Sequence, residues 1–235
     1  MSASEPSVHL LKRLVPRPLK RVMKRAYQQR QLDDALSRFA QLRSDQTPSP
    51  ALLEELQAGW ANHGMAARTD YLAEVCRQGA RAERAILECG SGLTTLLLGL
   101  LAGRRGVPVW SLEHLPEWHG RVASALGRHQ IPGVHLLLAP LEDYGTFTWY
   151  APQEPLPENF DLVVCDGPPS DIQGGRYGML PVMRSRVDER TTILLDDAER
   201  PSEHRVLTQW KHDAAVTIAV RETPSGAFAL VRGVL

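Results

Sequence analysis

Acidic residues stand at or just beyond the ends of five short apolar runs, each of the kind that forms a buried strand. They are Glu88, Glu113, Glu142 with Asp143, Asp166, and Asp196 with Asp197. In a doubly wound parallel sheet the carboxyl ends of the strands form one edge, and ligands bind along it. Carboxylates placed there can accept hydrogen bonds from hydroxyl or amino groups and can remove a proton. A shared ligand site explains these acids better than core packing does.

The first of these runs leads into a glycine turn. Residues 86–95 are typical of a short strand, a turn containing Gly90 and Gly92, and the start of a helix that ends near Gly103. Glycine lets a ligand approach the backbone, and a helix N-terminus offers free N–H groups. A dinucleotide fingerprint would need a third glycine where Thr95 stands, and the phosphate-binding Gly-x-x-x-x-Gly-Lys motif is absent. The structural alternative is a glycine turn with no ligand.

Glu88 separates these alternatives. A diphosphate repels an acid at this position, whereas an amino group or ribose hydroxyls would bind to it. Glu-x-Gly-x-Gly at a strand-to-helix turn resembles the first motif of class I S-adenosylmethionine-dependent methyltransferases. The resemblance covers roughly residues 80–235 and implies that S-adenosylmethionine is the cofactor.

The resemblance also implies which residues contact the cofactor. They are Glu88, Gly90, Ser91, Gly92, Glu113, Leu141 and Asp166. Glu113 stands at the end of the second strand, where an acid accepts hydrogen bonds from ribose hydroxyls in NAD enzymes as well. Leu141 is expected to pack on the adenine ring.

Asp166 ends the apolar run 160–165 and is followed by a rigid Gly-Pro-Pro turn. This segment resembles the fourth methyltransferase motif, in which the acid lies next to the transferred methyl group. It differs from the Asn/Asp-Pro-Pro-Tyr/Phe pattern of enzymes that methylate amino groups of nucleic-acid bases, because a glycine intervenes and no aromatic residue follows. We therefore expect Asp166 at the chemical centre, and the difference argues against a nucleic-acid acceptor.

Asp196 and Asp197 follow the fifth strand, beside the expected position of Asp166. The trio resembles oxygen-methylating enzymes that hold a divalent ion, although the catechol-type enzymes have Asp-Asn at this pair. Asp166, Asp196 and Asp197 would then bind Mg²⁺, which lowers the pKa of a substrate hydroxyl. Without a metal, Asp166 would be a general base and Asp197 would cap the next helix. Asp197 and His114 are the further catalytic candidates.

Other segments are candidates for substrate contacts. Residues 174–178, Gly-Gly-Arg-Tyr-Gly, are expected to form a mobile loop over the site. Trp149 and Tyr150 in a proline-rich connection, and Trp60 with Asn62 before the sheet, are candidates for a lid. Packing is the alternative for each aromatic residue.

The alternation of strand and helix patterns predicts an α/β fold with a doubly wound, mainly parallel seven-stranded sheet and a C-terminal antiparallel hairpin. The expected strands cover residues 84–88, 107–113, 134–139, 160–166, 191–196, 214–222 and 227–231, and the expected helices cover residues 116–126, 179–187 and 202–212. This sheet also resembles that of the class I methyltransferases.

A basic segment precedes this domain. Residues 1–43 contain ten Lys or Arg and three acids, although the net charge of the 235-residue chain is zero. A helical pattern covers residues 18–43, and Thr-Pro-Ser-Pro ends it. We therefore divide the chain into an N-terminal extension with its linker, residues 1–50, and a methyltransferase domain, residues 51–235. The basic, amphipathic pattern suits an anionic membrane surface, and a docked, solvated helix is the alternative.

The sequence contains no run of about 18 apolar residues that would span a membrane, and no secretory signal pattern. Cys76, Cys89 and Cys165 form no close pair, which is typical of a reducing compartment. A cytoplasmic location is therefore expected, with membrane association at most peripheral.

These features together predict an S-adenosylmethionine-dependent methyltransferase that acts on an oxygen of a small-molecule or glycan-type acceptor. One alternative is a protein of the same fold that binds the cofactor in a regulatory role without catalysis. Another is an RNA methyltransferase that uses the basic arm. The acceptor and the oligomeric state are left open.

Overall fold

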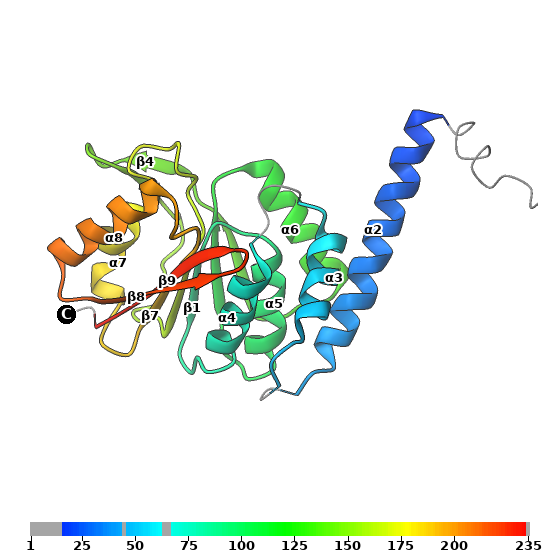
Figure 1. Ribbon diagram of the computed structural model, residues 1–235, viewed down its shortest axis with the longest axis horizontal. Coiled ribbons are helices and arrows are strands. Elements are labelled where there is room, and N and C mark those ends of the chain that lie inside the picture. The colour runs from blue at the N-terminus through cyan, green and yellow to red at the C-terminus, as the bar shows by residue number, and fades with distance from the viewer. Residues whose placement is uncertain (1–15, 44–45, 63–66, 234–235) are drawn as a thin grey trace, which may run out of the picture.

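The computed structural model describes residues 16–43, 46–62 and 67–233, which form a seven-stranded sheet with helices on both faces (Figure 1). The strands are β1 Ile86–Cys89, β2 Val109–Glu113, β3 Val134–Leu138, β6 Leu162–Cys165, β7 Thr192–Leu195, β8 Thr217–Thr223 and β9 Gly226–Arg232. Their order in the sheet is β3-β2-β1-β6-β7-β9-β8. All neighbouring pairs are parallel except those made by β9 with β7 and β8. The expected sheet is therefore confirmed.

The strand order reverses between β1 and β6. From β1 the chain proceeds outward to β2 and β3, then returns to place β6 on the other side of β1. Cys89 and Cys165 are register partners at the ends of these two strands. A crevice forms where such a reversal separates the loops that follow the strands, and this is where ligands bind in doubly wound sheets.

Helices cover the two faces of the sheet unequally (Figure 1). One face is covered by α4 Thr69–Gly79, α5 Leu93–Gly103 and α6 Pro116–Arg128. The other face is covered by α7 Met179–Met183 and α8 Pro201–Asp213. Ile86, Val109, Val164 and Leu194 point to the first face, and alternate residues of the same strands point to the second. Both faces are apolar, as strands buried on two sides require.

A two-stranded antiparallel ribbon replaces the helix that would normally cross from β3 to β6. It consists of β4 Leu141–Asp143 and β5 Thr148–Tyr150, and it packs by Phe147, Trp149 and Tyr150 into the core on the α8 side. Strands of three residues carry too little alternation to be recognised from sequence. The consequence for the site is that β5 delivers Tyr150 to the reversal point.

The segment expected to be a mobile loop is instead a compact turn. Gly175–Gly178 forms a 3-10 helix, and Arg176 within it is buried. A Cβ atom on Gly174 would lie 2.4 Å from Phe147 Cβ, and one on Gly178 would lie 2.9 Å from Trp149 Cβ. The glycines therefore permit close packing against the ribbon, so residues 174–178 form a packed turn in place of the expected loop, and Arg176 within it lines the cavity. The expected helix at residues 179–187 is shortened to α7, followed by a 3-10 turn at Arg184–Arg186.

The N-terminal helix α2 Arg17–Ala40 has two dissimilar halves. Leu32, Ala35, Leu36 and Phe39 are buried against α3 Pro50–Trp60 and the start of α5. The first half extends beyond the body of the domain (Figure 1), and every residue from 16 to 27 is exposed. Within the described residues, no helix is long and apolar enough to cross a membrane.

Candidate functional site

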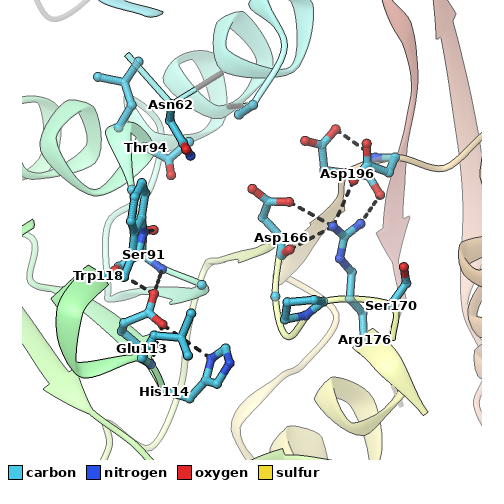
Figure 2. Close-up of a pocket in the computed structure, with 18 of the residues that line it drawn as sticks. Asn62, Ser91, Thr94, Glu113, His114, Trp118, Asp166, Ser170, Arg176 and Asp196 are labelled. Atoms are coloured by element: carbon cyan, nitrogen blue, oxygen red, sulfur yellow. Dashed lines mark hydrogen bonds and ion pairs between the residues drawn. The ribbon is translucent and has the colours of Figure 1, made fainter. Parts of the chain in front are cut away.

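A cavity of about 530 Å³ opens at the reversal point between β1 and β6. It is bounded by the residues that follow four strand ends, by the segment before α4 and by Tyr150 of the ribbon. Of the residues predicted to form the site, Gly90, Ser91, Gly92, Glu113, His114, Asp166, Asp196 and Asp197 line it. Figure 2 shows Glu113 and His114 on one side of the cavity, with Asp166, Asp196 and Arg176 on the other.

The two glycines of the turn have different reasons to be glycine. Gly90 has φ +91°, and a Cβ atom there would lie 3.0 Å from the nitrogen of Gly167. A side chain at this position would therefore be strained and would separate the β1 and β6 loops. Gly92 has φ 179°, an extended value, and a Cβ atom there would meet only Thr94 Oγ1 at 4.0 Å. Because the protein itself leaves room at Gly92, the space in front of it is available to a ligand.

Glu88 lies beneath the glycine turn and not among the residues that line the cavity. Its Oε2 accepts hydrogen bonds from Thr95 Oγ1 and Ser111 Oγ, both at 2.5 Å, and Thr95 Oγ1 accepts one from the Gly92 N–H at 2.8 Å. Burial raises the pKa of Glu88 to about 7, against the opposing effect of these hydroxyl donors. The carboxyl therefore holds the shape of the turn, a role different from the expected ligand contact.

Glu113 is buried at the end of β2 and is bonded to the glycine turn. Its Oε2 accepts from the backbone N–H of Ser91 at 3.1 Å and from Ser91 Oγ at 2.9 Å, and its Oε1 accepts from the Leu115 N–H at 2.9 Å. A carboxylate offers about four lone-pair sites, so capacity remains for a ligand hydroxyl. The position is the one that sequence reasoning gave to the ribose acceptor.

His114 and Tyr150 form the floor beside Glu113. His114 Nδ1 lies 3.4 Å from Glu113 Oε1, and the His114 and Tyr150 rings meet edge to face with centroids 5.9 Å apart. The Tyr150 hydroxyl is buried and has no hydrogen-bond partner within the described structure. Burial raises the pKa of Tyr150 well above its usual value, so the hydroxyl is a donor. His114 lies on the same side of the cavity as the glycine turn, across from the Asp166 cluster (Figure 2).

Asp166 is joined to the buried Arg176, for which the sequence predicted a place in the segment over the site but no role. Arg176 Nη2 donates to Asp166 Oδ1 at 2.9 Å and to the Asp166 carbonyl oxygen at 2.8 Å. The Asp166 side chain remains 28% exposed toward the cavity, whereas that of Arg176 is only 3% exposed. Burial raises the pKa of Asp166, Arg176 lowers it, and Asp197 raises it again, with a net upward shift. The arrangement positions a carboxylate of increased basicity at the cavity surface.

Asp197 reaches the same arginine through an uncommon backbone conformation. Its φ is +56°, in the left-handed region that aspartate tolerates better than most residues. Its Oδ2 accepts from Arg176 Nη2 at 3.0 Å and pairs with Arg200 Nη1 at 2.9 Å. The neighbouring Asp196 is buried, and burial together with Asp166 and Asp197 raises its pKa well above the usual value. Its backbone carbonyl accepts from Arg176 Nη1 at 2.6 Å.

Asp166, Asp196 and Asp197 each place a carboxylate oxygen within 4.8 Å of the others, which is the geometry expected of a metal site. An oxygen-only donor set suits Mg²⁺. However, Asp166 Oδ1 and Asp197 Oδ2 both accept from Arg176 Nη2, and a cation between them would face this guanidinium at close range. Arg176 therefore supplies the positive charge that the sequence analysis gave to Mg²⁺, and the residues present do not fit a metal ion well.

Trp60 and Trp118 line the cavity on the side of the glycine turn, and Arg121 packs against both rings. Trp118 Nε1 donates to the Ser91 carbonyl, and its ring meets Trp60 edge to face with centroids 6.0 Å apart. The guanidinium carbon of Arg121 lies 4.4 Å from the Trp60 ring centroid and 4.7 Å from that of Trp118. The contact of Trp60 with the cavity agrees with the sequence prediction, and Asn62 lines it as well. Trp149, the other predicted lid residue, is a fully buried core residue.

Arg68 closes the opposite rim with help from the far end of the chain. Its Nη2 pairs with Glu199 Oε1 at 2.5 Å and lies 3.7 Å from Asp197 Oδ1. A Cβ atom on Gly226, at the tip of the β8–β9 hairpin, would lie 1.2 Å from Arg68 Nη1. Only glycine at this hairpin tip therefore leaves space for the arginine.

Leu141, Glu142 and Asp143, the predicted adenine contacts and neighbouring acids, do not line the cavity. They form β4, where both acids are exposed. Arg68, Arg200 and Trp118 line the cavity although the sequence did not predict them, and Arg176 was predicted only as part of the segment 174–178 over the site. One signal could have identified an arginine: several acids on one buried edge require a buried cation, and Arg176 is the cation nearest to Asp166 in the sequence.

Comparison with solved structures identifies the fold. No protein-family profile and no curated protein matches this sequence. A methyltransferase from Podospora anserina with bound SAH (S-adenosylhomocysteine) is similar over 99% of both chains, with a TM-score of 0.57 and 15% identity. An O-methyltransferase from Thermotoga maritima, described as SAM-dependent, is similar over 80% of this chain and 72% of its own, with a TM-score of 0.54 and 10% identity.

A putative O-methyltransferase from Klebsiella pneumoniae aligns over 97% of this chain and 95% of its own, with a TM-score of 0.51 and 16% identity. The strand order and the terminal antiparallel hairpin agree with these similarities. The chain therefore has the class I methyltransferase fold. Identities this low establish the architecture, and the activity has to be argued from the site.

Proposed function

We propose that this protein is an S-adenosylmethionine-dependent methyltransferase that methylates an oxygen of a small-molecule or glycan-type acceptor. The observation that carries the proposal is that one cavity contains both an open glycine turn beside Glu113 and a partly exposed carboxylate, Asp166, across from it. The first can hold a nucleoside, and the second can remove a proton. The similarity to solved methyltransferases supports the same assignment.

The residues on the turn side fit a nucleoside with an amino-acid tail. Glu113 would accept from ribose hydroxyls, and the backbone at Gly92 leaves space for the ligand. The unpartnered Tyr150 hydroxyl would donate to a ligand acceptor atom, because a buried donor without a partner costs free energy. Trp118 and His114 would bound the ligand laterally. When bound, S-adenosylmethionine supplies an electrophilic methyl group on a positively charged sulfur.

The residues on the acid side would position the acceptor and remove its proton. Asp166 has a raised pKa and an exposed oxygen, so it can accept a proton from a hydroxyl group. Arg176 holds Asp166 in place by one hydrogen bond to the carboxylate and one to the backbone carbonyl oxygen, and it balances the charge of the carboxylate. Asp197 is fixed by Arg176 and Arg200 and would orient the acceptor by accepting from a second hydroxyl. No step requires a metal ion, because the guanidinium already compensates the carboxylates.

The size and surface of the cavity favour a small acceptor. A volume of about 530 Å³ is within the range of ordinary small-molecule sites and must hold the cofactor as well. The aromatic wall formed by Trp60 and Trp118 offers an apolar surface against which a sugar ring or a flat small molecule can pack. The paired acids opposite it suit an acceptor rich in hydroxyl groups.

Two measurements on the purified full-length chain test the proposal. Isothermal calorimetry with S-adenosylmethionine and S-adenosylhomocysteine should show one site per chain. Transfer of a labelled methyl group should then be screened over phenols, polyols and sugars, with and without a chelator, and the activity is expected to survive the chelator. Absence of binding for both nucleosides would overturn the cofactor assignment. Activity that is lost with chelator and restored by Mg²⁺ would overturn the role given to Arg176.

A further inference from the structure

The first half of α2 has an apolar stripe that no part of the described structure covers. Leu19, Val22, Met23 and Tyr27 are spaced as neighbours along one side of a helix. Their exposed fractions are 49%, 62%, 58% and 70%, the largest values among the exposed large apolar residues of the described chain. A contiguous apolar surface of this kind, unlike single exposed residues, marks an interaction site.

The stripe faces away from the domain. At about 100° per residue, the centre of the stripe lies about 160° around the helix from the centre of the buried set Leu32, Ala35, Leu36 and Phe39. The two apolar faces of α2 are therefore on nearly opposite sides. The stripe cannot be a continuation of the packing against α3, and whatever covers it approaches from the side opposite to the domain.

The other side of the same segment is strongly basic. Arg17, Lys20, Arg21, Lys24 and Arg25 are all exposed, and their mean direction is about 160° from the apolar stripe. The sequence contains no acid from residue 17 to residue 32. A second copy of the helix packed on the stripe would bring two such dense positive segments together without any compensating carboxylate, which disfavours self-association.

We propose that the first half of α2 binds the surface of an anionic lipid membrane. The apolar stripe enters the boundary between headgroups and acyl chains, and the lysine and arginine side chains of the opposite face lie at the level of the headgroups, where their long side chains reach the anionic groups. The domain packs on the opposite side of α2 and therefore lies in water when the stripe is in the membrane. Nucleic acid would use the basic residues alone and leave the stripe exposed, so a membrane explains both faces.

The test is co-sedimentation of the full-length protein with vesicles of phosphatidylcholine, with or without phosphatidylserine. Wild type should bind the phosphatidylserine vesicles, less so at high salt, because exposed charges are screened. The triple variant Leu19→Gln, Val22→Gln and Met23→Gln keeps all charges and the helix propensity, and its binding should be weaker by about tenfold or more. Replacing Lys20, Arg21, Lys24 and Arg25 by Gln should weaken binding about a hundredfold, on phosphatidylserine vesicles only.

The matched control is Val220→Gln, which removes an exposed valine from β8 and should bind as wild type does. All the variants should retain their circular dichroism and melting temperature, because the substituted side chains are exposed. Equal vesicle binding by the stripe variant and wild type would overturn the proposal. A dimer that depends on the stripe, seen in sedimentation without any vesicle binding, would also overturn it. The remaining contrary outcome is that wild type does not bind vesicles, while wild type and the stripe variant both bind an RNA oligonucleotide in a salt-sensitive way.

Discussion

Thr95 and Glu88 are joined by a hydrogen bond of 2.5 Å between the threonine Oγ1 and the carboxylate Oε2. Thr95 stands where a dinucleotide fingerprint would have its third glycine. Its hydroxyl accepts from the Gly92 N–H and donates to Glu88, so it links the turn to the strand beneath it. Thr95 therefore stands in place of the third glycine, and its side-chain hydrogen bonds hold the turn against β1.

We expect Gly92→Val to abolish cofactor binding in a folded protein. The protein leaves space at this position, so the added side chain would fill only the space meant for the ligand. The control is Gly120→Val on the exposed surface of α6, where a Cβ atom meets nothing within 4 Å. Calorimetry should show wild-type affinity for the control and none for Gly92→Val. Gly90→Val is a poorer test, because its φ of +91° and its contact with Gly167 would disturb the fold itself.

Tyr150→Phe should weaken cofactor binding by about fivefold, the effect of one neutral hydrogen bond. The stability of the ligand-free protein should be unchanged or slightly higher, because the buried hydroxyl has no partner there. Tyr177→Phe is the matched control, since the Tyr177 hydroxyl donates to Asp213 at 2.8 Å outside the cavity. Equal cofactor affinity of Tyr150→Phe and wild type would remove Tyr150 from the ligand site.

Arg176→Met should destabilise the protein by about 3–5 kcal/mol, the range for removing one partner of a buried charge cluster. The substitution would leave Asp166 and Asp197 without the guanidinium that bonds both of them. Arg190→Met is the control, because Arg190 pairs with Glu83 on the surface and exposed pairs contribute about 1 kcal/mol or less. Urea titrations of the three proteins measure the difference. A cost for Arg176→Met no larger than that of the control would contradict the charge-balancing role.

Asp166→Asn should lower turnover by about 10²-fold with cofactor affinity little changed, because general-base removal has this scale. The wild-type rate should rise with pH, since the carboxyl must lose its proton before it can accept one from the substrate. The raised pKa of Asp166 moves this rise to higher pH than for an ordinary aspartate. The exposed Asp171 provides a control through Asp171→Asn, which should leave the rate unaffected. Turnover near the wild-type value in Asp166→Asn would move the chemical centre elsewhere, with His114 the next residue to test.

Glu88→Gln should alter how stability depends on pH. The Glu88 pKa is about 7 in the folded protein and 4.5 when unperturbed, so the folded state binds the proton more tightly. The contribution of Glu88 to stability is therefore largest below about pH 4.5 and is lost as the pH rises to about 7. The neutral glutamine removes this loss, and at pH 8 the ligand-free variant should be more stable than wild type by about 3 kcal/mol. Melting temperatures of both proteins across this pH range provide the measurement, and parallel curves would contradict it.

The parts of the fold that sequence could predict are those in which a residue's neighbours in the chain determine its environment. The run 86–89 is apolar or bonded on both faces and is fully buried as β1, and the glycine turn follows directly. The terminal hairpin was predictable because a three-residue connection permits only an antiparallel pair. Glu113, Asp166, Asp196 and Asp197 line one cavity because parallel strands share one carboxyl edge, whereas Glu88 lies beneath the turn, and Glu142 and Asp143 lie outside the cavity.

The remainder depended on contacts between segments distant in the sequence. Residues 174–178 have the composition of a loop, and only packing against Phe147 and Trp149 makes them a fixed turn. Arg176 and Glu203 are 27 positions apart, and nothing in the sequence pairs them, although their charged groups lie 3.5 Å apart. Leu141 follows the third strand as expected, but it belongs to the ribbon β4–β5 and lies outside the cavity. The strands of this ribbon are too short to be predicted from the sequence.

The glycine at the hairpin tip, Gly226, has a practical consequence for shortening the chain. One wall of the cavity uses Trp60 from α3, and the opposite rim uses Arg68, whose guanidinium occupies the space that a side chain at Gly226 would fill. The wall and the rim therefore both come from residues that precede β1, and the rim also packs against the hairpin at the other end of the polypeptide. A shortened chain that begins at β1 would keep the glycine turn and Asp166 yet lose Trp60 and Arg68. One that stops at β7 would lose Asp196, Asp197 and the hairpin that packs on Arg68, so the functional unit is longer than the segment that contains the motifs.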